Sequence, residues 1–147
     1  MQPKLLLRIS AFFTLFVAVG HTLGNCTRKA TTDAHQQEIF KKMEGYKFNF
    51  GGSMRSWDNF YDGMSLDVSV TLAVFTVLLW LISGSAKKYP VFCTSLLWTI
   101  LACFVGLTII GFMYFFVVPA TCTLIASLLI LVVIFQLRKL SPINSVL

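Results

Sequence analysis

The residues best suited to chemistry in this chain are one histidine and three aspartates beside apolar segments. His21 lies near the end of the first apolar run, and Asp58, Asp62 and Asp67 lead into the second. A histidine next to a carboxylate can hold a proton, bind a ligand or coordinate a metal. A carboxylate within a membrane costs about 2.5 to 3.5 kcal/mol at the bilayer centre, so such residues usually have a function. We therefore place the candidate site here.

Polar and aromatic residues accompany these aspartates. The set that we predict to form a ligand-binding pocket is His21, Arg55, Trp57, Asp58, Tyr61, Asp62 and Asp67. On a helix that begins near Ser56, Asp58 and Asp62 share one face, whereas Asp67 lies on the opposite side. A structural interpretation stays open, in which Asp58 and Asp62 lie in the first helical turns and pair with Arg55. The helix dipole favours negative charge there by about 0.3 to 1 kcal/mol.

His21 has a structural interpretation too, in which its ring bonds to a backbone carbonyl. Gly20 and Gly24 flank it with the spacing that lets a neighbouring helix approach closely. Ala102 and Gly106 repeat that spacing, and we expect them to form a packing face rather than a site.

The four cysteines, Cys26, Cys93, Cys103 and Cys122, are scattered and contain no CxxC pair. Zinc ligation and thioredoxin-like redox chemistry therefore lack their usual spacing. The second histidine, His35, lies in the polar segment, which argues against a two-histidine haem site within a bundle. We expect no metal and no cofactor. A disulfide between Cys26 and Cys122 stays open.

Four apolar stretches must position these residues. A hydrocarbon core about 30 Å thick requires roughly 20 residues of helix at 1.5 Å per residue. The stretches are apolar on every face, unlike a soluble helix with one apolar stripe. The predicted fold class is an all-α membrane protein: a four-helix transmembrane bundle that forms a single membrane domain over residues 1–147. The predicted spans are about 5–23, 64–83, 91–113 and 119–137.

The third and fourth spans are joined by hydrophobic residues, so a single long helix is the alternative. Pro119 argues against it, because proline costs about 3 kcal/mol in a helix interior but fits the first helical position. We predict a tight turn before a helix that begins at Pro119.

The charges predict an orientation. With an even number of spans, the basic residues at positions 4, 8, 87, 88, 138 and 139 all lie on one side. An excess of Lys and Arg marks the cytoplasmic side, so both termini are predicted to be cytoplasmic and residues 25–60 extracytoplasmic. The net charge of +6 then reflects topology and contact with anionic lipid. We expect no nucleic-acid partner.

Residues 25–60 are predicted to form an extracytoplasmic cap between spans one and two. A short amphipathic helix is expected to begin with Thr32 as its cap and to end at Gly45. Tyr46, Phe48 and Phe50 then alternate with polar residues, which indicates an extended stretch before two glycines. We expect too few strands for a sheet.

Two motifs resemble a family of small, uncharacterised bacterial inner-membrane proteins with four spans. They are GHTLG (residues 20–24), which closes the first span, and FNFGGSMRSWDNFYDG (residues 48–63), which precedes the second. The resemblance covers nearly the whole chain. It implies the four-span topology, a bacterial inner membrane and a pairing of the two polar patches, and it implies no activity.

The preferred hypothesis is a non-enzymatic integral membrane protein, either a small lipid- or ligand-binding module or an accessory subunit of a membrane complex. The expected partners are membrane lipids, with a membrane protein or a second copy as further candidates. The alternative is a membrane enzyme acting on a lipid-soluble substrate at the outer leaflet, with His21 as general base and an aspartate orienting it. A proton-coupled carrier is disfavoured, because the second span has no polar residue between Thr76 and Ser83.

Overall fold

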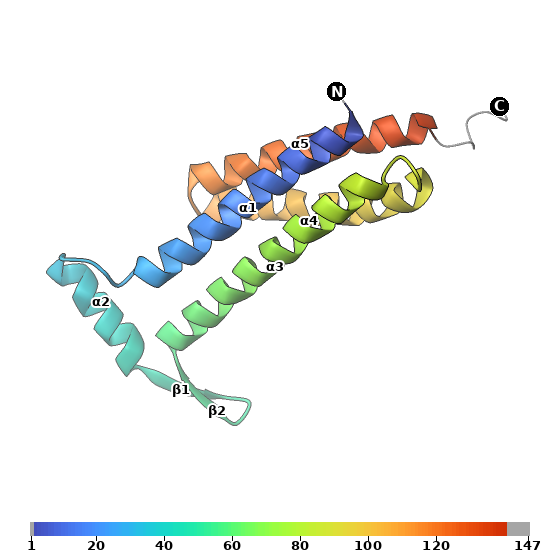
Figure 1. Ribbon diagram of the computed structural model, residues 1–147. Coiled ribbons are helices and arrows are strands. Elements are labelled where there is room, and N and C mark those ends of the chain that lie inside the picture. The colour runs from blue at the N-terminus through green and yellow to red at the C-terminus, as the bar shows by residue number, and fades with distance from the viewer. Residues whose placement is uncertain (1, 141–147) are drawn as a thin grey trace. The chain divides into compact units, whose positions relative to one another are not determined.

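The chain forms helices and one short hairpin, as seen in Figure 1, a computed structural model that describes residues 2–140. Within these residues the elements are α1 (Pro3–Thr27), α2 (Ala34–Gly45), β1 (Lys47–Phe50), β2 (Ser53–Ser56), α3 (Trp57–Ser85), α4 (Pro90–Tyr114) and α5 (Val117–Leu140).

Four helices, α1, α3, α4 and α5, are long and apolar enough to cross a membrane. They have 25, 29, 25 and 24 residues, which exceeds the length that a hydrocarbon core about 30 Å thick requires. The four predicted spans are therefore confirmed as helices, and each helix extends beyond its predicted span at both ends. This architecture fits an integral membrane protein.

The chain divides into two compact units, which we describe separately. The apolar unit comprises Met1–Val17 and Leu72–Leu147, and the polar unit comprises Ala18–Thr71. The predicted four-helix bundle and its cap concern how these units are arranged in the membrane, so both stay predictions.

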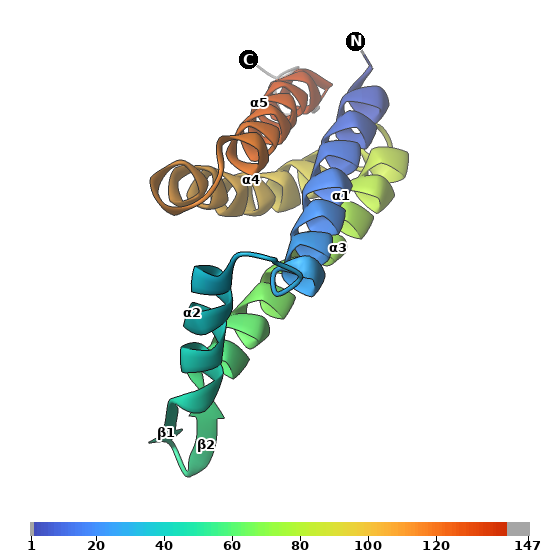
Figure 2. The ribbon, with the colours of Figure 1, turned by 90° about the vertical axis from the view of Figure 1, so that its left-hand side faces the viewer.

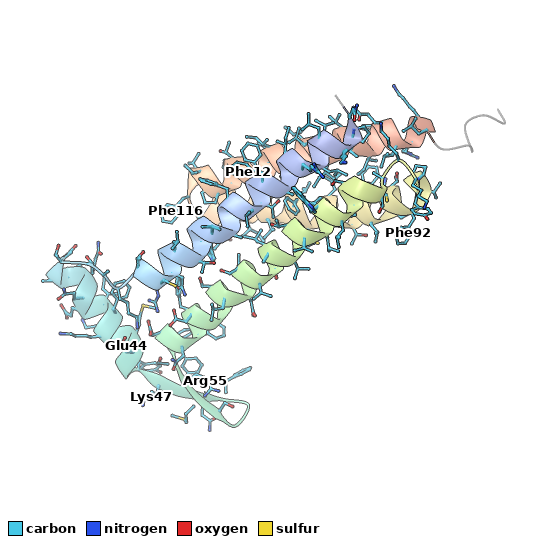
Figure 3. The ribbon with its side chains drawn as sticks, in the orientation of Figure 1. Phe12, Glu44, Lys47, Arg55, Phe92 and Phe116 are labelled. Atoms are coloured by element: carbon cyan, nitrogen blue, oxygen red, sulfur yellow. The ribbon has the colours of Figure 1, made fainter. Side chains whose placement is uncertain are left out.

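The core of the apolar unit draws side chains from all four long helices. Leu7, Leu79, Phe104 and Ile134 are 0% exposed and come from α1, α3, α4 and α5 respectively. Large hydrophobic side chains also cover the outside of this unit, and Phe116 projects away from the ribbon in Figure 3. Lipid tails are the solvent that suits so extensive an apolar surface.

Helices α4 and α5 pack closely beside the turn that joins them. A Cβ atom built on Gly111 would lie 3.0 Å from the Cβ of Ala120, so the glycine allows the two backbones to approach. Thr108 Oγ1 donates to Thr123 Oγ1 across the same interface at 3.0 Å. This pair of helices therefore has a small-residue contact reinforced by a hydrogen bond.

The turn between α4 and α5 is confirmed, but α5 begins two residues earlier than predicted. Pro119 is its third residue rather than its first. The first helical turn has no intrahelical acceptors for its N–H groups, so proline removes no helical hydrogen bond at the third position either.

The two predicted packing pairs do not make close contacts. Among residues 2–140, a Cβ built on Gly20, Gly24 or Gly106 meets nothing within 4 Å, and Ala102 is exposed. Small residues spaced four positions apart give a helix a face that another helix can approach closely. Close packing also requires a second helix opposite that face. Packing faces at these glycines therefore stay a prediction, whereas Gly111 makes a close helix contact.

In the polar unit, β1 and β2 form an antiparallel hairpin below α2 in Figure 2, with Lys47 opposite Ser56 and Phe50 opposite Ser53. The expectation of too few strands for a sheet is wrong. Gly51 and Gly52 have φ of 58° and 82°, and two consecutive positive φ angles make the two-residue turn that matches the twist of paired strands.

We expect Gly52→Ala to destabilise the hairpin by about 1 to 2 kcal/mol, because the left-handed region is strained for any residue with a Cβ. Gly45→Ala is the matched control, since Gly45 ends α2 without a positive φ. Amide hydrogen exchange in β1 and β2 measures the effect. Equal protection of these amides in the two variants would show that the turn tolerates a side chain.

Helix α2 begins one residue later than a Thr32 cap requires. The N-cap is Asp33, whose carboxylate accepts a hydrogen bond from the backbone N–H of His35 at 2.8 Å. Aspartate and threonine both serve as N-caps, so the sequence alone did not separate them. The predicted end at Gly45 is confirmed.

Candidate functional site

The site is built on the first turns of α3, which a reciprocal cap holds in place. The Ser56 hydroxyl accepts from the Asn59 backbone N–H at 3.1 Å, and the Asn59 side-chain oxygen accepts from the Ser56 backbone N–H at 3.3 Å. This arrangement satisfies two N–H groups at the helix start, as a capping box does. It sets the direction in which Asp58, Tyr61 and Asp62 leave the helix.

Arg28, the first residue after α1, is held against that face of α3. Its Nη2 donates to Asp58 Oδ1 and to Asp62 Oδ1, the latter at 2.9 Å, and its Nε donates to Asp62 Oδ1 at 3.2 Å. The guanidinium carbon lies 4.7 Å from the ring centre of Tyr61 and 5.5 Å from that of Phe40. Positions 58, 61 and 62 share one helical face, so one cation can contact all three.

Lys29 extends the same ion-pair network to α2. Its Nζ donates to Asp58 Oδ2 at 2.6 Å and also to Glu44 near the end of α2. The two oxygens of Asp58 are thus divided between Arg28 and Lys29. Asp58 is only 4% exposed, and a buried carboxylate needs such partners.

The pKa values of both cations are raised. Burial lowers the pKa of Arg28, but hydrogen bonds and charge attraction from Asp58 and Asp62 outweigh it and raise the pKa above its ordinary value. Hydrogen bonds to Asp58 and Glu44 raise the pKa of Lys29 above 10.5. The raised pKa of Lys29 stabilises the folded state fully below pH 10.5, its ordinary pKa. This contribution to the free energy of unfolding is lost as the pH rises through the higher pKa of the folded state. Both cations therefore stay charged at neutral pH.

The structure brings some of the predicted site residues together and separates others. Asp58, Tyr61 and Asp62 meet around Arg28. Arg55, which we expected to pair with the aspartates, is exposed on β2 (Figure 3) and donates to the backbone oxygen of Met54 at 2.9 Å. Arg55 lies on β2 rather than on α3, so the interpretation that pairs it with Asp58 and Asp62 is wrong. Arg28 makes these ion pairs instead.

The remaining predicted residues lie around this network rather than within it. Trp57 packs against Phe48, with ring centres 4.9 Å apart, and so connects α3 to the hairpin. Asp67 is exposed, in keeping with its predicted place on the other side of the helix.

His21 bonds to a side chain rather than to a backbone carbonyl or a carboxylate. Its Nε2 lies 3.0 Å from Ser65 Oγ, and the neighbouring Thr22 Oγ1 donates to Ser69 Oγ at 3.0 Å. Together these bonds join the end of α1 to α3 within the polar unit. Hydroxyl and imidazole groups of this kind commonly join helices in membranes.

No protein-family model, curated protein or solved structure matches this chain. The resemblance to four-span inner-membrane proteins thus stays a prediction, and the site must be interpreted from its own geometry.

A cavity of ≈ 360 Å³ opens beside the ion-pair network. Its lining consists of Asn25, Cys26, Arg28, Lys29, Asp62 and Leu66. Two of the lining residues have a buried polar atom, Asn25 Oδ1 and Arg28 Nη1, with no hydrogen-bond partner among residues 2–140. An unfilled buried donor or acceptor costs about 1 to 3 kcal/mol, which a suitable ligand or water would offset.

Metal and disulfide chemistry have no assembled site in the part of the chain that the structure describes. Within residues 2–140, no three His, Cys, Asp or Glu residues gather to hold a metal ion. All four cysteines are free thiols, with Cys26 exposed and Cys122 buried. Cys26 and Cys122 belong to different units, so the disulfide between them stays a prediction.

The central residues that sequence reasoning missed are Arg28 and Lys29. Six acidic residues balance six basic ones between positions 25 and 67, so the net charge of this segment does not indicate which residues pair. A usable signal was present: these are the first charged residues after the first span, and the aspartates immediately precede the second. Opposite charges at the near ends of consecutive spans favour a pair across the connection.

We expect His21→Ala to lower the free energy of unfolding by about 0.6 kcal/mol, and by at most about 1.7 kcal/mol, the range measured for hydrogen bonds between membrane helices. His35→Ala is the matched control, because the His35 contact to Asp33 uses only its backbone N–H. Reversible unfolding in detergent micelles compares the variants. A larger loss for His35→Ala would contradict a role for the His21–Ser65 bond in stability.

Proposed function

We propose that this chain is a non-enzymatic integral membrane protein whose polar unit binds a lipid or a lipid-like ligand. The observation that supports it is the cavity of ≈ 360 Å³, where charged and polar groups adjoin Leu66. Leu66 follows Asp62 by four residues on α3, so it lies on the same face, one turn nearer the apolar part of the helix. A polar end beside an apolar end suits an amphiphilic ligand.

The proposal includes the predicted topology: both termini cytoplasmic and residues 25–60 extracytoplasmic in a bacterial inner membrane. Four apolar helices and the basic residues near the termini support it. The guanidinium carbon of Arg8 lies 4.5 Å from the ring centre of Trp80, a pairing of residues typical of a membrane interface.

The enzymatic alternative requires His21 beside a carboxylate and facing a cavity. The partner of His21 is instead the Ser65 hydroxyl, and His21 is not among the residues that line the cavity. The charged groups of the cavity hold one another in ion pairs, which keeps the aspartates from acting as free bases. We therefore prefer binding over catalysis.

Lipid retention tests the proposal. After purification in mild detergent, we expect native mass spectrometry to detect bound lipid on the wild type and less on Leu66→Trp, because the indole fills the cavity. Leu81→Trp is the matched control, since Leu81 is a similarly exposed residue of α3 outside the cavity.

Two results would argue against this function. One is a lipid-free monomer, and the other is equal lipid retention by Leu66→Trp and the wild type. Co-purification of a stable membrane-protein partner without lipid would favour the accessory-subunit role instead.

A further inference from the structure

We propose that the cavity beside Arg28 recognises the primary ammonium of a phospholipid headgroup, as in phosphatidylethanolamine. This inference rests on the proposed lipid binding and specifies the headgroup. Three observations carry it: unfilled acceptors, an excess of negative charge, and an unfilled guanidinium donor beside an apolar side chain.

The lining of the cavity offers two acceptors that other residues do not use. Asp62 receives both hydrogen bonds from Arg28 on Oδ1, and its Oδ2 makes no hydrogen bond within residues 2–140. The Asp62 side chain is 39% exposed, so a ligand can reach it. Asn25 Oδ1 is the second unfilled acceptor. A primary ammonium has three donors and can satisfy both.

The charge of the network favours a cation. Two cations, Arg28 and Lys29, are joined to three carboxylates, Glu44, Asp58 and Asp62, which leaves one negative charge in excess. Desolvation beside a partly buried network strengthens the attraction for an ammonium relative to bulk water.

The same cavity accounts for the rest of a phospholipid. Arg28 Nη1 lacks an acceptor, and phosphate oxygens are the acceptors that guanidinium groups bind best. A phosphoethanolamine headgroup carries its phosphate and its ammonium close together, so one molecule supplies both. Leu66 then lies where the acyl chains begin.

The test places the full chain in nanodiscs with equal amounts of phosphatidylethanolamine, phosphatidylcholine and phosphatidylglycerol. Phosphatidylcholine keeps the positive charge but has no N–H donor, and phosphatidylglycerol has no cation. We expect the protein-bound lipid, counted by native mass spectrometry, to be enriched about tenfold in phosphatidylethanolamine over phosphatidylcholine, as one charge-assisted hydrogen bond predicts.

The variants separate recognition from folding. Asp62→Asn removes the charge and is expected to abolish the enrichment, whereas Asp67→Asn, the same change on the other side of α3, keeps it. Asn25→Ala touches no ion pair and is expected to reduce the enrichment severalfold even if Asp62→Asn folds poorly. Free ethanolamine is expected not to displace the lipid, and displacement would identify a free amine as the ligand.

Two failures are distinguishable. If all three lipids are retained equally, or if Asp67→Asn and Asp62→Asn behave alike, headgroup recognition is wrong while lipid binding stands. If no lipid is retained, the proposed function fails as well.

Discussion

Replacing Arg28 with alanine is expected to lower the free energy of unfolding of the polar unit by about 3 kcal/mol. The variant leaves Asp58, which is 4% exposed, without one of its two cations, and Asp62 without its hydrogen bonds. Breaking a buried ion pair by removing one partner typically costs about 3 to 5 kcal/mol. The lower end applies because Lys29 still bonds to Asp58. Hydrogen exchange over Ala18–Thr71 and chemical unfolding in micelles measure the loss.

The matched control for this variant is Arg55→Ala. Arg55 is exposed, and its side chain contacts the backbone of its neighbour, so its removal is expected to change stability by no more than about 0.5 kcal/mol. A double variant, Arg28→Met with Asp58→Asn, removes the uncompensated charge and is expected to recover part of the loss. Equal stability of Arg28→Ala and Arg55→Ala would mean that the ion-pair network contributes little.

Gly111→Leu is expected to destabilise the apolar unit by about 2 kcal/mol, because overpacking a tight contact typically costs about 1 to 3 kcal/mol. A Cβ at this position would lie 3.0 Å from Ala120 Cβ and 3.3 Å from Ala120 Cα. Backbone atoms cannot move aside as the end of a flexible side chain can, so α4 and α5 must separate. Thermal unfolding in detergent measures the effect.

Gly106→Leu is the control on the same helix, since no described residue lies within 4 Å of a Cβ built there. Both variants gain the same helix propensity over glycine, about 0.8 to 1 kcal/mol, so their difference isolates the contact with Ala120. If Gly111→Leu is as stable as Gly106→Leu, the close approach of α4 and α5 does not limit stability.

The proposed headgroup site also gives the ion-pair network a purpose beyond stability. A buried salt bridge is weak evidence for stability, because desolvation offsets much of its attraction. In the described part of this chain, the network leaves one carboxylate oxygen of Asp62 and one guanidinium nitrogen of Arg28 without hydrogen-bond partners. A network that holds unfilled groups in fixed positions is preorganised for a ligand.

Local sequence patterns were sufficient wherever the physical cause is local. Continuous apolar runs predicted the four long helices, because the length of a run and its freedom from charge decide whether it can cross lipid. Pro119 predicted the break before α5, and Gly45 the end of α2. The helical repeat alone placed Asp58 and Asp62 on one face and Asp67 on another.

Sequence patterns did not predict the features that depend on contact between two different elements. The hairpin was missed because Ser53–Ser56 lacks an alternating apolar pattern, and its pairing with Lys47–Phe50 depends on the glycine turn. Glycines with suitable spacing proved to be open, while Gly111 packs against Ala120. In each case the deciding contact lies on another element.

By itself, the sequence determined the four apolar helices and the position of Asp58, Asp62 and Asp67 around the start of the second span. Only the tertiary structure decided that Arg28 and Lys29 hold those acids, that Arg55 does not, and that His21 bonds to Ser65. The reason is physical: a helix span follows from the composition of consecutive residues, whereas a charge 30 positions away becomes a partner only when the chain folds back and brings it within a few ångströms.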